Sequence, residues 1–281
     1  MRQCYPYQIV NVFAESRFGG NPLAVFTDAA GLSDADMQLI ARQFNLSETV
    51  FIHPGDDAAL ASLRIFTPSY ELPFAGHPTI GSAAVLHALR QPGDAFTLRT
   101  QAGLIPITLN DGVFRLTAVA ATQRAANVGC TEAAAMLGLD EADIALAPVW
   151  VNAGSEQMLI RLASREAVLR ARPDHTLFTR HATLRPGRSI AYLWYQADGV
   201  ATVRLFFEQQ GSVIEDPGTG SACANLGGWC VLNGLAPLSW RIEQGEAIQR
   251  PNVLYLDVAA DGRVQVGGKV QAVAEGVFTL P

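Results

Sequence analysis

Two segments of this chain share one sequence pattern, and this repeat constrains the fold more than any other feature. Residues 71–77 read Glu-Leu-Pro-Phe-Ala-Gly-His, and residues 215–221 read Glu-Asp-Pro-Gly-Thr-Gly-Ser. The Glu, the Pro and the final Gly recur at one constant offset, and a run of small and apolar residues follows each copy. A Gly-containing turn that leads into such a run is typical of the start of a buried helix. The repeat therefore predicts two similar domains built on one plan.

We call residues 71–77 the first elbow and residues 215–221 the second elbow. The first turn of a helix has backbone N–H groups without intrahelical partners, and the helix dipole makes that end positive. Both properties favour a carboxylate or a phosphate group. We therefore expect the two domains to close on a small anion, with the active-site cleft between them.

The pattern of the remaining chain supports a duplication. Ser33 is a candidate N-cap with Asp36 at the capping-box position, and the helix that they open has an apolar face. The fold class that we predict is α+β, with two similar domains. We place the boundary in the small-residue stretch 118–127, which gives domains 1–121 and 122–281, and the final strand could cross back to the first domain. The expected strands are 7–13, 23–26, 49–52, 96–98, 157–162, 190–195, 240–242 and 277–280, the expected helices 33–44 and 164–171, and the expected turns 19–22 and 152–154.

Composition excludes several classes of partner. The 281 residues are 49% hydrophobic and carry a net charge of −6 without a basic cluster, so we expect no nucleic-acid partner. No apolar run reaches the roughly 18 residues of a membrane span, and the N-terminal segment lacks a signal-peptide core. The four cysteines have neither CxxC spacing nor the density of a secreted scaffold. We expect a cytoplasmic protein and include a homodimer among its expected assemblies.

The residue inventory also argues against a cofactor. The only lysine is Lys269, which we expect in a hairpin turn, so a buried Schiff-base lysine has no candidate. The chain has no GxxxxGK[ST] phosphate loop, and no GxGxxG motif follows a strand. Its five histidines lack metal-ligand spacing. We therefore expect no cofactor and no metal, and chemistry that side chains perform alone.

A few polar residues near the elbows are candidates for that chemistry, and each also has a purely structural interpretation. Glu48 is either a solvated loop residue or a general acid/base whose pKa rises because Phe44, Val50 and Phe51 bury it in part. His77 either begins a helix or contacts a ligand. Asp216 either caps the second helix or binds substrate. Cys223 and Cys230 are expected to be core residues.

The arrangement of these residues resembles the phenazine-biosynthesis PhzF-like family, within the diaminopimelate-epimerase-like fold. The resemblance rests on blocks in family order that cover nearly the whole chain: residues 20–26, 45–51, 66–68, 71–78 and 215–221. It implies two domains, each a mainly antiparallel sheet curled around a central helix, with the active-site cleft between them. It also implies proton transfer without a cofactor on a small carboxylate substrate held between the elbows. By resemblance, Glu48 is the proton carrier, and the substrate contacts are Ser47, Gly76, His77, Asp216, Gly220 and Ser221.

Two departures qualify what the resemblance implies. The family often has Phe-Ser-Pro or Phe-Ala-Pro before the second elbow, whereas residues 205–210 read Leu-Phe-Phe-Glu-Gln-Gln here, so we expect an altered pocket wall. Related epimerases have a cysteine on each elbow, and neither elbow of this chain has one. We therefore favour an isomerase that shifts a proton with a single base. An amino-acid racemase or epimerase, with Cys223 as its thiol, and a non-catalytic metabolite-binding protein are the alternatives.

Overall fold

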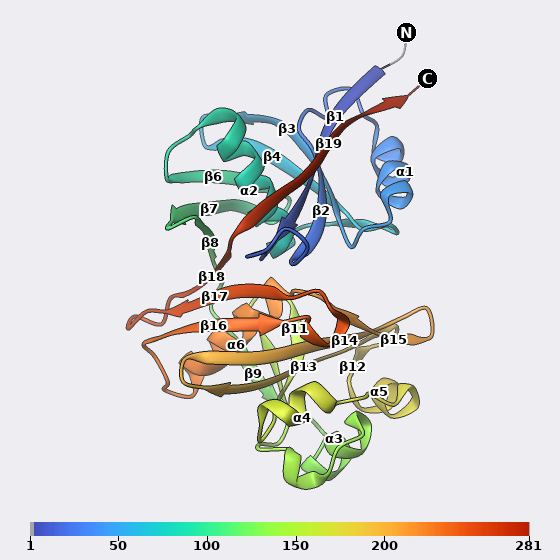
Figure 1. The fold of residues 1–281 in the computed structure, drawn as a ribbon, viewed down its shortest axis with the longest axis vertical. Coiled ribbons are helices and arrows are strands. Elements are labelled where there is room, and N and C mark those ends of the chain that lie inside the picture. The colour runs from blue at the N-terminus through green and yellow to red at the C-terminus, as the bar shows by residue number, and fades with distance from the viewer. Residues whose placement is uncertain (1–2, 281) are drawn as a thin grey trace. The chain divides into compact units, whose positions relative to one another are not determined.

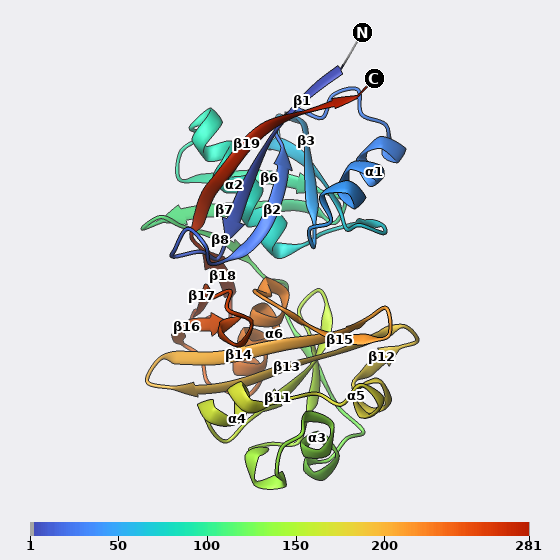
Figure 2. The ribbon, with the colours of Figure 1, turned by 45° about the vertical axis from the view of Figure 1, so that its right-hand side comes forward.

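The computed structural model describes residues 3–280, which form two compact units. Unit 1 combines the chain up to Thr117 with the segment from Gly267 onward, and unit 2 spans Ala118–Val266. Our division after residue 121 left the place of the last strand open. In the structure that strand, β19 (Val270–Leu280), pairs antiparallel with β1 (Gln3–Val12), and the two lie side by side in both ribbon views (Figures 1 and 2). Unit 1 thus contains both ends of the described chain.

Unit 1 is a curved sheet around one helix, α2 (Gly76–Arg90). Antiparallel pairs join β1 to β2, β3 to β4, β4 to β5, β6 to β7 and β7 to β8, and parallel pairs join β2 to β3 and β4 to β6. The strands are β2 (Asn21–Phe26), β3 (Thr49–Asp56), β4 (Ala59–Phe66), β5 (Glu71–Leu72), β6 (Ala95–Thr100), β7 (Gly103–Asn110) and β8 (Val113–Thr117).

Unit 2 repeats this plan around α6 (Gly220–Leu232). Antiparallel pairs join β10 to β11, β13 to β14, β14 to β15 and β16 to β17, and parallel pairs join β11 to β13 and β14 to β16. The strands are β9 (Thr122–Ala125), β10 (Val149–Asn152), β11 (Glu156–Arg161), β12 (Thr183–Arg185), β13 (Arg188–Ala197), β14 (Val200–Gln209), β15 (Ser212–Asp216), β16 (Leu238–Gln244) and β17 (Asn252–Val258), while β18 (Val264–Gly268) spans the division between the units.

Pairing directions match strand by strand between the units. The same sequence of antiparallel and parallel pairings occurs once in each unit. In unit 1 it involves β1, β2, β3, β4, β5, β6 and β7, and in unit 2 it involves β10, β11, β13, β14, β15, β16 and β17, in that order. In both series the short strand β5 or β15 leads into the central helix, which begins at the last Gly of its elbow. The predicted α+β class with two similar, mainly antiparallel domains is confirmed.

Small residues let each central helix approach its strands closely. A Cβ added at Gly81 in α2 would lie 2.5 Å from a methyl carbon of Leu23 in β2. A Cβ added at Gly227 in α6 would lie 2.7 Å from a methyl carbon of Leu256 in β17. Real Cβ atoms do not come so near to other carbons, so larger residues would push helix and sheet apart.

The outer helices show how local sequence sets element ends. Helix α1 (Asp34–Phe44) begins at the predicted N-cap Ser33 with Asp36 completing the capping box, and Met37, Ile40 and Ala41 are buried, as its apolar face predicted. Helix α4 (Arg165–Arg170) is capped by Ser164. The predicted elements did not include α3 (Cys130–Leu137), α5 (His175–His181) or the strands β4, β7, β8, β9, β10, β12, β14, β17 and β18. The short 3₁₀ turns η1 (Glu141–Asp143) and η2 (Glu246–Ile248) complete the elements.

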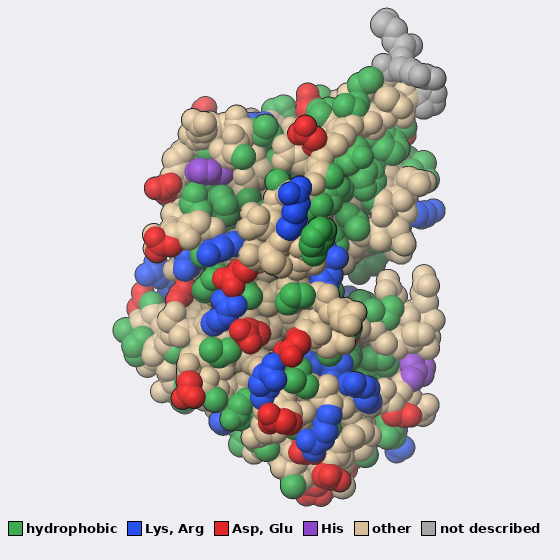
Figure 3. All heavy atoms as spheres, viewed as in Figure 1, with side chains coloured by type: hydrophobic (Ala, Val, Ile, Leu, Met, Phe, Trp, Pro, Cys, Tyr) green, Lys and Arg blue, Asp and Glu red, His purple; other side chains and the backbone are tan. Residues whose placement is uncertain are grey.

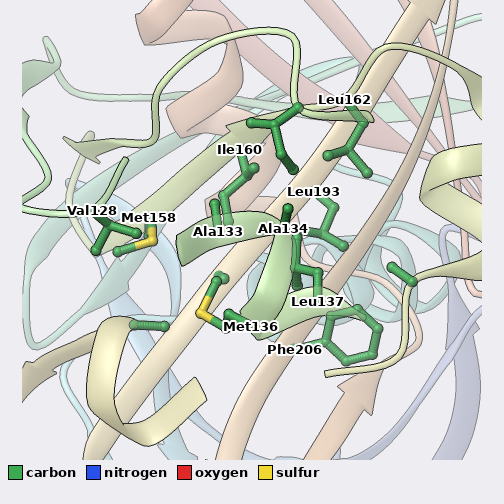
Figure 4. Close-up of a cluster of buried hydrophobic side chains, with 14 of the residues drawn as sticks. Val128, Ala133, Ala134, Met136, Leu137, Met158, Ile160, Leu162, Leu193 and Phe206 are labelled. Atoms are coloured by element: carbon green, nitrogen blue, oxygen red, sulfur yellow. The ribbon is translucent and has the colours of Figure 1, made fainter. Parts of the chain in front are cut away.

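Each unit has its own hydrophobic core outside the central helix. In unit 1, aromatic rings from β1, β2, β3 and β19 pack against α1. In unit 2, α3 inserts buried side chains against β11, β13 and β14 (Figure 4). Phe206 belongs to this second core, and residues 205–209 of the segment that we expected to form an altered pocket wall lie in strand β14.

Charged side chains of both signs share the face of the molecule that Figure 3 shows. On the face seen in Figure 3, acidic and basic side chains are interspersed over both units. No helix among residues 3–280 is long and apolar enough to cross a membrane. Lys269 is not in a hairpin turn, because the strand that begins after it pairs with β1.

Candidate active site

Glu48 and His77 lie next to each other at the first elbow. Helix α1 ends with Asn45 in the left-handed conformation (φ 52°), which turns the chain so that Glu48 immediately precedes β3. His77 is the second residue of α2. Its Nδ1 lies 3.4 Å from Oε2 of Glu48, and the two side chains are 8% and 17% exposed. The structure thus brings the predicted proton carrier to the start of the central helix.

Burial determines the charge of His77. Removal from water lowers the pKa of His77 to about 3, although the nearby carbonyl of Pro22 acts in the opposite direction. His77 is therefore a neutral imidazole at physiological pH, and its contact with Glu48 is not an ion pair. Its Nε2 is buried and has no hydrogen-bond partner among the described residues. A neutral imidazole can donate one hydrogen bond and accept another, which suits it to orient a carboxyl group or a ligand.

The other predicted site residues of unit 1 have different degrees of exposure. Ser47 lies beside Glu48 in sequence, and its side chain is exposed. Gly76 is half-buried at the helix start. The N-cap of α2, Ala75, cannot cap with its side chain, and the first turn contains no acidic residue. The first turn of α2 therefore lacks the side-chain acceptors that α1 obtains from Ser33 and Asp36.

The second elbow holds its turn with a network of side chains. Thr219 donates a short hydrogen bond to the carboxylate of Asp216. Gln244, which is buried, donates to the carbonyl of Asp216 at 2.9 Å and to Oγ1 of Thr219 at 3.0 Å. Its Oε1 accepts from the backbone N–H of Thr219 at 3.1 Å. Asp216 is half-buried, and these bonds fix the backbone that carries it.

Gly220 and Ser221 begin α6, again without a capping side chain or an acidic residue in the first turn. Oγ of Ser221 accepts a hydrogen bond from Nε2 of Gln157 at 2.9 Å. Ser221 is half-buried, whereas Gln157 is buried beneath it. The predicted site residues thus form two sets: Ser47, Glu48, Gly76 and His77 in unit 1, and Asp216, Gly220 and Ser221 in unit 2.

An arginine binds the glutamate of each elbow through two parallel hydrogen bonds. Arg64 donates to Glu71 at 2.7 and 2.5 Å, and Arg204 donates to Glu215 at 3.1 and 2.6 Å. Each guanidinium also lies over a phenylalanine ring two residues later, Phe66 or Phe206. Neither arginine was among the predicted site residues. The signal was present as Arg-Ile-Phe at 64–66 and Arg-Leu-Phe at 204–206, each upstream of an elbow.

The cysteines are poor candidates for chemistry. Cys223 and Cys230 are buried in α6. Burial raises the pKa of Cys230 to about 12 and raises that of Cys223 further, so both are thiols at neutral pH. Among residues 3–280, no three His, Cys, Asp or Glu side chains gather where they could hold a metal ion.

Comparisons with known proteins agree on one family. The family model described as phenazine biosynthesis-like protein (PhzC-PhzF) matches residues 10–276. The chain is 50% identical over 280 residues to an uncharacterized isomerase of Pasteurella multocida, covering 99% of this chain and 95% of that protein. It is 31% identical to the trans-2,3-dihydro-3-hydroxyanthranilate isomerase of Pseudomonas fluorescens, covering 96% of each chain.

A solved structure shares the whole fold. The crystal structure of a PhzF-family phenazine biosynthesis protein of Bacillus anthracis matches with a TM-score of 0.85 and 22% identity over 99% of both chains. At this identity the match concerns the fold alone. Taken with the family match over most of the sequence, these similarities show that the chain belongs to the phenazine biosynthesis-like (PhzC-PhzF) family.

Proposed function

We propose that this chain, an isomerase of the phenazine biosynthesis-like family, shifts a proton within a small carboxylate substrate and uses Glu48 as its single base. The observation that supports this most is the 3.4 Å contact between Glu48 and the buried, neutral His77. Glu48 as carboxylate takes a proton from a carbon next to a carboxylate or a conjugated system. It then returns the same proton to another carbon on the same face, so atoms and charge balance without a co-reactant.

The remaining roles follow from chemistry at the two elbows. His77 and Asp216 contact polar groups of the substrate. Uncapped N–H groups that begin at Gly76 and Gly220, together with Ser221 and Ser47, bind its carboxylate. We also propose that no cofactor takes part, because the inventory of lysine, histidine and cysteine side chains offers no Schiff-base or metal site. A cytoplasmic location and a homodimer stay predictions, and light scattering of the purified protein tests the second.

The substrate class comes from relatives and from the site together. A protein 31% identical to this chain is named as an isomerase of trans-2,3-dihydro-3-hydroxyanthranilate, a ring that carries one carboxylate. We propose a cyclic carboxylate of this kind as the substrate. The runner-up, a racemase or epimerase, would need a second base, and the buried thiol of Cys223 is a weak candidate for it.

Isotope exchange tests the proposal. Wild-type protein is incubated in D₂O with a panel of cyclic amino and hydroxy acids that includes trans-2,3-dihydro-3-hydroxyanthranilate, and products are analysed by NMR. We expect a positional isomer in which any deuterium enters on the face that lost the proton. Inversion of a stereocentre with deuterium uptake would favour the racemase instead. Binding without exchange across the panel would favour a non-catalytic binding protein.

A further inference from the structure

A chain of buried amide side chains lies behind Ser221 in unit 2. Asn225, one turn further along α6, and Gln157 in β11 are 0% and 2% exposed. Nδ2 of Asn225 donates to Oε1 of Gln157 at 2.7 Å, and Nε2 of Gln157 donates to Oγ of Ser221 at 2.9 Å. Ser221, at the end of this series of hydrogen bonds, is its one member that is partly exposed.

Two backbone groups determine the direction of every hydrogen bond in this chain. The N–H of Ala153 can only donate, and it lies 2.7 Å from Oδ1 of Asn225. The carbonyl of Ser155 can only accept, and it lies 2.8 Å from Nδ2 of Asn225. The Asn225 amide therefore has one possible orientation, in which it presents a donor to Gln157.

The orientation of the Asn225 amide also determines the hydrogen bond between Gln157 and Ser221. Because Gln157 must accept from Asn225 with its oxygen, it must turn its NH₂ group towards Ser221. The Ser221 oxygen therefore accepts a hydrogen bond from inside the protein. Its own hydrogen has no acceptor among the described residues, and its side chain is half-buried at the helix start.

We infer that Asn225 and Gln157 fix the Ser221 hydroxyl as a hydrogen-bond donor to a carboxylate oxygen of the substrate, which makes Gln157 a positioning residue for specificity. The inference rests on the proposed function, since it assumes that the substrate carboxylate binds at the start of α6. The bond from Gln157 uses one of the two lone pairs of the Ser221 oxygen and directs the hydroxyl hydrogen away from Gln157. An outward hydrogen favours an anion over an ammonium group at the same place, because an ammonium has only donors.

A double-mutant cycle tests this inference with benzoate as the probe. Benzoate affinity is measured by calorimetry for wild type, Ser221→Ala, Gln157→Leu and the double variant. We expect Ser221→Ala to weaken binding about 10- to 100-fold, the range of a hydrogen bond to a charged group, and Gln157→Leu to weaken it about 2- to 10-fold. In the Ser221→Ala background, Gln157→Leu should cost nothing more, because Gln157 acts through the hydroxyl.

Two further variants separate positioning from loss of structure. Gln157→Glu keeps the bond from Asn225 but presents an acceptor, so Ser221 must turn its hydrogen inward. This variant should weaken benzoate binding more than Gln157→Leu does. In the Ser221→Ala background, which has no hydroxyl, the effect of Gln157→Glu on benzoate affinity measures the contribution of its added negative charge. Gln244→Leu is the matched control, since Gln244 is equally buried and holds the same elbow without contacting Ser221. Its effect should be equal in both backgrounds.

The outcomes are distinct from those that test the isomerase. Benzoate binding needs no turnover, so failure of the isotope-exchange experiment leaves this cycle unaffected. The inference is overturned if Ser221→Ala leaves benzoate affinity unchanged, or if Gln157→Leu costs the same in both backgrounds. Thermal melts of each variant show whether it is folded at the titration temperature.

Discussion

The two elbows share a framework but differ in the residues that could do chemistry. Phe66 pairs with Thr49, which follows Glu48, whereas Phe206 pairs with Ala191, which follows Ile190. The position that holds a carboxylate in unit 1 is thus aliphatic in unit 2, where Ile190 packs against the core. A duplicated fold with one carboxylate at this position fits a reaction with a single base.

The two arginine–glutamate pairs differ in burial, and the more buried pair is in unit 2. In unit 2, Arg204 and Glu215 are 5% and 6% exposed, and Arg204 also donates to the carbonyls of Val168, Leu169 and Ala171 at the end of α4. In unit 1, Arg64 and Glu71 are 26% and 19% exposed, and Arg64 also binds Asp34. The second elbow is therefore anchored by the more buried ion pair, whereas the proposed proton carrier, Glu48, lies in unit 1.

Breaking the two ion pairs should give unequal losses of stability. Glu215→Gln leaves the buried Arg204 charge without its carboxylate, which typically costs about 3–5 kcal/mol. Glu71→Gln should cost about 1 kcal/mol, because Arg64 is partly hydrated and keeps Asp34. Urea unfolding of both variants measures the difference. Equal losses would mean that burial does not distinguish the elbows.

The two helix starts should also differ in how their stability depends on pH, because α2 has the titratable His77 at the position where α6 has Ser221. Burial lowers the pKa of His77 to about 3 in the folded protein, against about 6.5 when unfolded. Below pH 6.5 the unfolded chain binds a proton that the folded chain does not, so stability falls as pH falls. The free energy of unfolding of wild type, relative to His77→Asn, should decrease by about 1.4 kcal/mol per pH unit between pH 6 and 4.

The measurement is a set of urea titrations of both proteins across that range. Groups that titrate in both proteins cancel in the difference. A difference that stays constant with pH would show that His77 protonates in the folded state as readily as in the unfolded chain, and its neutral role beside Glu48 would be wrong.

The smallest expected effect concerns thiols and metals. Cys223 and Cys230 are buried thiols with raised pKa values, whereas Cys4 is exposed and Cys130 is half-buried. Iodoacetamide at neutral pH should label Cys4 and Cys130 first and leave activity unchanged, as should exhaustive chelation. Peptide mass spectrometry after labelling locates the adducts. Loss of activity in Cys223→Ala with an unchanged unfolding midpoint would favour the racemase.

The sequence was informative wherever a local rule determines structure. The Ser33 capping box predicted where α1 begins, and the repeated Gly elbows predicted where α2 and α6 begin. Helix α3 was missed because its short run of small residues, which lies just after the predicted domain boundary, has little apolar periodicity, and it becomes stable by packing into the unit 2 core. Strand β9 likewise depends on pairing with β10.

Long-range partners explain what the sequence could not predict about the site. Gln157 and Ser221, 64 residues apart, meet only because the fold brings β11 next to α6. Arg204 and Glu215 meet because β14 and β15 pair as antiparallel strands. Nothing local to Gln157 distinguishes it from an ordinary strand residue. The burial that lowers the pKa of His77 is likewise a property of the folded unit.

The most direct test of the central claim is the turnover of Glu48→Gln on the panel compound that wild type converts. Glutamine keeps the shape of the side chain but cannot carry the proton, so kcat should fall about 10²- to 10⁴-fold with an unchanged melting temperature. Glu71→Gln, which removes another carboxylate of unit 1, is the matched control and should retain most activity. A rate for Glu48→Gln above a tenth of wild type would contradict the account.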